Sequence, residues 1–117
     1  MNAPETLAAP VEALRRTAKR YHLDGVDALG RNRPEDAVRA LRLAVELDPG
    51  LEAAWNDLGV VMEALGNSQE AMRCYKRALG VRVGFVVART NLGMLTLQME
   101  LVQVLRRHAF TSSTARG

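Results

Sequence analysis

The sequence predicts an all-α protein, a short stack of about five helices made from repeated helix pairs. One observation behind this prediction is a unit of 34 residues that recurs along the chain, since a period of this length is typical of stacked repeats. The other is composition: 48% of the 117 residues are hydrophobic but only 4% are aromatic. The core must therefore consist mainly of Ala, Leu, Val and Met, and Ala and Leu are strong helix formers.

The repeat is visible as matching residues at a constant offset of 34. Two and a half copies can be followed. The matches pair Tyr21 with Trp55, Gly25 with Gly59, Ala37 with Ala71, Leu41 with Tyr75, Ala44 with Ala78, and Leu58-Gly59 with Leu92-Gly93.

The first unit is expected to contain two helices. The segment from Pro10 to Arg20 is amphipathic and extends the first helix toward the N-terminus. Pro34 suits the first position of the second helix, where its missing N–H is not needed. Pro49-Gly50 ends that helix. Its apolar stripe, with steps of three and four residues, consists of Ala37, Leu41, Ala44 and Val45.

The second unit repeats this plan. Its first helix is expected from about Leu51 to Leu65, and Gly66-Asn67 supplies the turn. Asn67 or Ser68 caps the second helix, because both side chains can accept a hydrogen bond from a free backbone N–H. The stripe of this helix consists of Ala71, Cys74, Tyr75, Ala78 and Leu79.

The third unit keeps only its first helix. We expect one long, continuous helix from about Phe85 to His108, with Gly93 as its only glycine. It would cap the stack, whose end face is otherwise exposed core. The alternative is that the natural array is longer. The expected layout is a flexible N-terminus (1–9), a helical domain (10–110) with repeats at about 18–51 and 52–85 and a capping helix at about 85–108, and a disordered tail (111–117).

These residues resemble the tetratricopeptide-repeat (TPR) family, whose unit follows the pattern W-x₂-L-G-x₂-Y…A-x₃-F…P. The resemblance covers roughly residues 18–97. The second unit matches at Trp55, Leu58, Gly59, Met62, Ala71, Tyr75 and Ala78, and the first at Tyr21, Gly25, Ala28, Ala37, Leu41, Ala44 and Pro49.

The pattern positions have physical roles. Gly25, Gly59 and Gly93 are expected where two helices of one unit approach closely, since glycine has no side chain. Trp55 and Tyr75 are expected to fill the space between neighbouring units.

Some positions depart from the pattern. Asp24 stands where the first unit should have Leu, and Leu23 could take that role. Seven residues separate Gly30 from Ala37 but five separate Gly66 from Ala71, so the first turn is expected to be looser or shifted. Val83 replaces the expected linking proline.

The resemblance implies a concave groove lined by the first helices of successive units. The matching positions are His22, Val26, Leu29, Asn56, Val60, Glu63, Thr90, Met94 and Leu97. Some members of the family grip acidic C-terminal tails of chaperones with Lys, Asn and Arg. The corresponding positions here are His22, Val26, Asp57, Val87 and Asn91. Asp57 would repel such a carboxylate, so binding of acidic chaperone tails is not expected.

No constellation of residues predicts catalysis, a cofactor site or a metal site. His22 and His108 are the only histidines and lie far apart in the sequence. His22 is interpreted as a structural histidine without a partner. Cys74, the only cysteine, lies on the packing side of a helix and is interpreted as a buried, inert thiol. The sequence therefore does not predict an enzyme.

Charge gives weaker indications. The net charge of +3 is too small for a general nucleic-acid binder. Four basic residues cluster in the N-terminal segment: Arg15, Arg16, Lys19 and Arg20. A solvated face is the first interpretation, and docking to an acidic protein or an anionic lipid surface is the alternative. Nucleic acid is disfavoured because no aromatic residues interleave with the cluster.

The predicted function is a protein–protein interaction module, an adaptor or assembly factor that binds a partner segment in the groove or at the ends of the stack. The alternative is a dedicated structural subunit of a larger complex, and a second copy of the chain is a further candidate partner. The N-terminus does not read as a secretory signal, and no internal disulfide can form. A cytoplasmic setting is expected.

Overall fold

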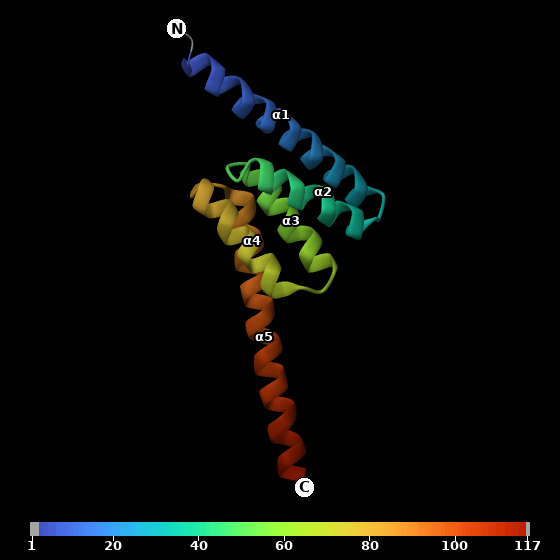
Figure 1. Ribbon diagram of the computed structural model, residues 1–117. Helices are drawn as coiled ribbons and strands as arrows, with labels where there is room; N and C mark the ends of the chain where they lie inside the picture. The colour runs from blue at the N-terminus through green and yellow to red at the C-terminus, as the bar shows by residue number, and fades with distance from the viewer. Residues whose placement is uncertain (1–2, 117) are drawn as a thin grey trace.

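The computed structural model describes the backbone of residues 3–116 and the side chains of residues 10–109. Within residues 3–116 it contains five α-helices and no strand (Figure 1). The all-α, five-helix prediction is therefore confirmed. The helices are α1 (Ala3–Gly30), α2 (Pro34–Leu47), α3 (Glu52–Ala64), α4 (Ser68–Val81) and α5 (Val86–Arg116).

The helices stack as pairs. α1 packs on α2 and α3 packs on α4, while α2 contacts α3 and α4 contacts α5. The fold measures 80 × 30 × 20 Å, and it is elongated because α1 and α5 are much longer than the helices between them (Figure 1). α5 continues over 111–116, where the sequence suggested a disordered tail.

The turns within the two units have the same geometry. Gly66 has φ +80 and Asn32, 34 residues earlier, has φ 60. The N–H of Asn67 donates to the carbonyl of Met62 at 2.8 Å, and the equivalent bond in the first unit measures 2.9 Å. Asn replaces Gly because Asn tolerates the left-handed conformation better than most residues. The expectation of a looser first turn is wrong, since Asn32 and not Gly30 is the equivalent of Gly66.

The helix starts agree with the sequence signals. Pro34 begins α2, with Glu35 and Asp36 in its first turn, where acidic residues favour the positive end of the helix dipole. Of the two candidate caps of α4, Asn67 is the one used. Its side chain accepts a hydrogen bond from the backbone N–H of Glu70 at 3.3 Å.

Two glycines allow the helices of each unit to approach closely. A Cβ atom on Gly25 would lie 2.6 Å from Cγ of Leu41, and one on Gly59 would lie 2.5 Å from Cε1 of Tyr75. Leu41 and Tyr75 are both fully buried. Each unit thus packs one large side chain of its second helix onto a bare stretch of its first helix.

The equivalent expectation for Gly93 is wrong. A Cβ atom on Gly93 would have no neighbour within 4 Å. The reason is that α5 continues straight through the place where the third unit would turn back. No second helix therefore covers Gly93 in this chain.

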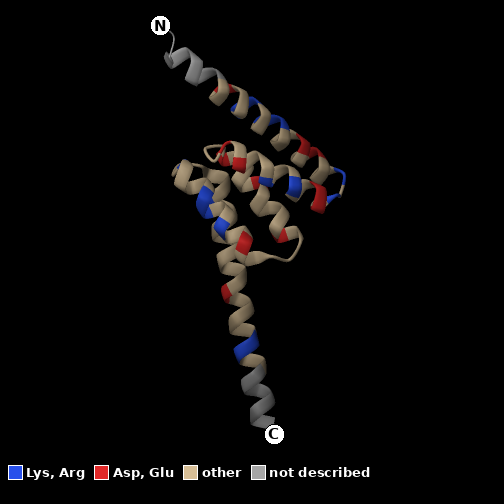
Figure 2. Ribbon diagram, in the orientation of Figure 1, with Lys and Arg blue, Asp and Glu red and all other residues tan. Residues whose placement is uncertain are grey.

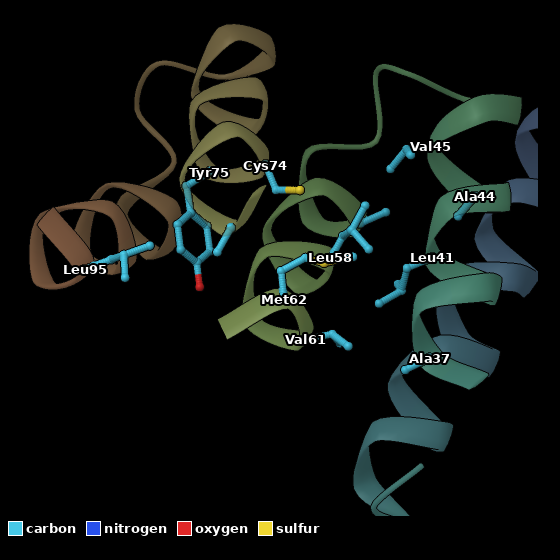
Figure 3. Packing of buried hydrophobic residues seen from close by; sticks show 12 residues of the cluster. Ala37, Leu41, Ala44, Val45, Leu58, Val61, Met62, Cys74, Tyr75 and Leu95 are labelled. Atoms are coloured by element: carbon cyan, nitrogen blue, oxygen red, sulfur yellow. The ribbon is translucent and has the colours of Figure 1, made fainter. Parts of the chain in front are cut away.

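The core lies between the two units (Figure 3). Tyr75, Leu41, Val61 and Cys74 are its largest fully buried side chains. Tyr75 contacts Gly59 of its own unit and its ring also lies near Leu95 of α5 in Figure 3. It thereby fills the space between units as expected.

Trp55 and Leu23 differ in burial. Trp55 is partly buried and donates its indole N–H to the carbonyl of Pro49 at 2.8 Å, which ties α3 to the preceding linker. Leu23 is exposed, so the suggestion that it replaces the missing pattern leucine is wrong. In the second unit Leu58 packs toward α2 (Figure 3), whereas its equivalent in the first unit, Asp24, is exposed to solvent.

The two glycine positions make opposite predictions. Gly59→Ala should lower the free energy of unfolding by about 1–3 kcal/mol, because the Tyr75 ring must move. Gly93→Ala should raise it by about 0.5–1 kcal/mol, because Ala is the better helix former and nothing obstructs its methyl group. Urea denaturation at one protein concentration measures both. Equal effects of the two substitutions would contradict this account of Gly59.

Candidate functional site

The nine predicted groove residues lie on the three first helices α1, α3 and α5. They are called the first-helix face below. Val26 and Met94 are exposed on this face, and Val60 is partly buried. Asn56 is only 4% exposed, so it supports the face rather than offering itself to a partner. The remaining members are His22, Leu29 and Glu63, which are intermediate, and Thr90 and Leu97, which are exposed.

Polar side chains connect these three helices. Nε2 of His22 on α1 lies 2.6 Å from Oδ2 of Asp57 on α3. Because a carboxylate can only accept, the Nε2–H of the imidazole is the donor. Asn91 on α5 donates to Asn56 on α3 at 3.0 Å, and Asn56 lies 3.4 Å from Asp57. We call these four residues the interhelical polar network.

The interhelical polar network follows the repeat. His22 with Asp57 and Asn56 with Asn91 are each 35 residues apart, so one residue bonds to the successor of its own equivalent in the next unit. The interpretation of His22 as a histidine without a partner is wrong. Placing α1 and α3 side by side would have suggested Asp57 as the partner of His22. Matching residues 34 apart does not show this contact, because the two residues are 35 apart.

The network bears on the exclusion of acidic chaperone tails. Three of the five positions concerned are His22, Asp57 and Asn91, and all three are engaged with each other or with Asn56. Asp57 keeps a carboxylate on the face, with its side chain 30% exposed. That acidic chaperone tails do not bind therefore stays a prediction, and these contacts are a physical reason for it.

Glu63 lies at the inner edge of the face. Tyr75 donates its hydroxyl hydrogen bond to the Glu63 carboxylate. Burial raises the pKa of the Tyr75 phenol above its usual value, and the bond to Glu63 raises it further. The phenol thus stays protonated and fixes Glu63 against α4, which limits how far this carboxylate can turn toward a ligand.

A hollow of about 540 Å³ lies away from the first-helix face. Trp55 and Arg77 are among the residues that line it, and the Arg77 guanidinium lies 5.6 Å from the centroid of the Trp55 ring. Sequence reasoning did not single out this basic surface, although Arg73, Lys76 and Arg77 recur along one side of a helix. The lining residues are Pro49, Trp55, Arg73, Lys76, Arg77, Gly80 and Val81.

The predicted basic patch lies in the middle of α1. Arg15, Arg16, Lys19 and Arg20 are all exposed, and Figure 2 shows basic residues along this helix. Arg15 pairs with the carboxylate of Glu12 at 3.1 Å. Arg20 lies two positions before His22 of the first-helix face and lines a second hollow of about 260 Å³ with Thr17, Tyr21 and Asp24.

Cys74 is a free, buried thiol. Burial raises its pKa from 9.0 to about 11, with a smaller contribution from the Glu70 carboxylate. Such a thiol is a poor nucleophile at neutral pH, because the thiolate is the reactive form. Among the described residues, no group of three or more His, Cys, Asp or Glu could hold a metal ion.

Hydropathy adds one finding about the helices. None of those described in residues 3–116 combines the length and the apolar character needed to cross a membrane.

The raised pKa of Cys74 predicts a loss of stability at alkaline pH. In the unfolded chain the thiol loses its proton near its ordinary pKa of 9.0, whereas in the folded chain it keeps the proton to about 11. The folded state then binds more protons, so the free energy of unfolding falls as pH rises through this range, by up to about 1.4 kcal/mol per pH unit for one group.

Urea denaturation at about pH 8 and about pH 10 measures the fall expected from proton linkage. Cys74→Ala removes one of the two responsible groups, and its stability should fall less steeply. The buried Tyr75 phenol contributes with the same sign. Equal pH dependence in the wild-type chain and the variant would contradict the assignment to Cys74.

Known proteins resemble this chain in sequence and in structure. The chain is 34% identical over 62 residues to the peroxisomal targeting signal receptor of Kluyveromyces lactis, which covers 53% of this chain and 11% of the receptor. It is 30% identical over 82 residues to the receptor of Saccharomyces cerevisiae, which covers 63% of this chain and 13% of the receptor. The chain thus spans about an eighth of the length of these relatives. No family model matches it.

Two further similarities extend over more of the compared protein. An uncharacterized protein of Methanocaldococcus jannaschii is 31% identical over 64 residues, covering 55% of this chain and 74% of that protein. Two crystal structures of MamA superpose with TM-scores of 0.70 and 0.67 at 22% identity, over 78% and 82% of this chain and 57% and 58% of MamA. At this identity the MamA structures show the fold. With the 34-residue repeat and its packed glycines, these similarities show that the chain belongs to the tetratricopeptide-repeat family.

Proposed function

We propose that this chain is a protein-interaction module, an adaptor or assembly factor that holds a segment of a partner protein against the first-helix face. One observation carries the proposal. Three adjacent helices are joined by the interhelical polar network, with bonds of 2.6 and 3.0 Å, and they still leave apolar side chains uncovered on the same face. A rigid surface with apolar and fixed polar groups suits the recognition of a protein segment.

The apolar part of the face forms a row across the stack. Val26, Val60 and Met94 are each 34 residues apart, so they lie at equivalent heights on α1, α3 and α5. Packed helices are about 8–10 Å apart, so the row is about 20 Å long. An extended segment advances about 3.3 Å per residue, and we therefore propose that about six residues of the partner lie across the three helices.

A second row lies one turn further along the helices. It consists of Leu29, Glu63 and Leu97. Its outer members are apolar and its middle member is the carboxylate that accepts from Tyr75. We propose that the partner segment presents apolar side chains to both rows and no carboxylate near Asp57 or Glu63, because like charges at such short range disfavour binding.

The similar proteins support a binding role. The receptors of K. lactis and S. cerevisiae are, by name, receptors for a peroxisomal targeting signal. The interhelical polar network also holds the one histidine of this face in place against Asp57. We therefore assign binding and no reaction to the first-helix face.

The alternative of a dedicated structural subunit makes a different prediction for the isolated chain. A module that binds transiently should be stable when purified alone, whereas a permanent subunit should unfold without its complex. The core described above, with four large side chains fully buried, favours the module. Thermal unfolding of the purified chain distinguishes the two, since an isolated subunit would show no cooperative transition.

Affinity purification from the native cell, followed by mass spectrometry, identifies the partner, and purified components then give its affinity. Val26→Glu and Val60→Glu should each weaken binding about tenfold or more, equivalent to about 1.4 kcal/mol, because each places a charge in the apolar row. Val11→Glu is a matched control: Val11 lies on α1 like Val26, and the two are 45% and 44% exposed. Unchanged affinity in folded Val26→Glu and Val60→Glu variants would exclude the first-helix face.

A further inference from the structure

One face of α5 carries a long apolar stripe that is exposed and lies outside the core of the described residues. Its positions alternate in steps of three and four residues over three heptads, which is the spacing of a coiled-coil interface. Five of the positions are apolar and exposed, and the two polar ones are Thr90 and His108. We call the set the α5 stripe: Val87, Thr90, Met94, Leu97, Leu101, Val104 and His108.

The helices of this chain pack on the opposite side of α5. Ala88 and Leu95 are buried and Met99 is partly buried against the core. Figure 1 shows α5 running past α4, with its C-terminal half away from the other helices, and Figure 2 shows few charged residues along it. A capping helix needs a polar outer face to keep a stack soluble, and α5 does not have one.

The stripe has the length and area of a helix-pairing surface. From Val87 to His108 it extends about 32 Å, at 1.5 Å per residue. Together with the neighbouring Leu105, its apolar residues leave on the order of 600 Å² exposed per chain, which is below but comparable with the ~800 Å² per partner of a standard interface.

We propose that the α5 stripe is covered by the α5 stripe of a second copy of this chain, in an antiparallel pair with a two-fold axis near residue 99. In this register Met94 faces Val104 of the other copy and Leu97 faces Leu101. Thr90 faces His108, so the polar positions meet at the two ends and four apolar layers lie between them. A two-fold interface must be complementary to itself, and this register meets that condition.

The antiparallel direction also separates the two stacks. Each stack packs against the N-terminal half of its own α5, so the stacks lie at opposite ends of the pair. A parallel pair would bring both stacks to the same end and place His108 against His108.

Pairing would cover Met94 and Leu97 but leave Val26 and Val60 on α1 and α3 free. Because the proposed partner segment lies across Val26, Val60 and Met94, it and the second copy compete for Met94, and in the dimer only the α1 and α3 part of each first-helix face stays open to a partner. The inference itself does not depend on the proposed function, since its test uses the purified chain alone.

The molar mass of the full chain in solution tests the pairing. At about 50 µM, where a dimer of micromolar affinity is mostly assembled, light scattering should give twice the 12.8 kDa of one chain. Leu97→Glu with Leu101→Glu should give 12.8 kDa with an unchanged helical circular dichroism signal. A matched control, Leu14→Glu with Leu23→Glu, changes two exposed leucines on α1 and should stay dimeric.

Cross-linking tests the register and does not depend on the double variant folding. In a Cys74→Ala background, Met94→Cys and Val104→Cys chains should form a disulfide with each other when mixed and oxidised. Neither should link to itself, because the two copies of position 94 would be about 15 Å apart along the helices, beyond the ~7 Å limit between Cα atoms. A 12.8 kDa wild-type mass, a dimer that survives the double variant, or a disulfide from Met94→Cys alone would overturn the proposal.

Discussion

The structure depends on one steric constraint: the two helices of a unit can approach closely only where the first helix lacks a side chain. Gly25 and Gly59 provide that space, and Leu41 and Tyr75 occupy it. Both side chains become fully buried, which adds to the apolar burial that a small, aromatic-poor core needs. The same constraint fixes the spacing of α1 on α2 and of α3 on α4.

The interhelical polar network adds direction to this packing. Apolar contacts tolerate small shifts of one helix along another, whereas hydrogen bonds at 2.6 and 3.0 Å do not. The network repeats with the units, because it joins residues at a constant separation of 35. It therefore sets the relative height of Val26, Val60 and Met94, on which the proposed partner site depends. The order in the first-helix face is thus a consequence of the order in the repeat.

The sequence was sufficient for the helices and their pairing, because the repeat, the prolines and the Asn67 cap are local signals. Three features were not predicted from these local signals. The exposure of Gly93 depends on a second helix that the third unit lacks. The bond of His22 to Asp57 depends on the offset between neighbouring helices, which residue matching does not contain. α5 continues past His108 to Arg116 because no proline or glycine ends it there. The polar composition of this segment had suggested a disordered tail.

The steric constraint can be observed directly in solution by nuclear magnetic resonance. If Tyr75 packs on Gly59, its ring protons should give nuclear Overhauser effects to the Gly59 Hα protons. The ring current should also shift those protons away from their ordinary values, since the ring lies against this backbone. A normal Gly59 Hα shift, with no Overhauser effect to the Tyr75 ring in the folded chain, would contradict the account.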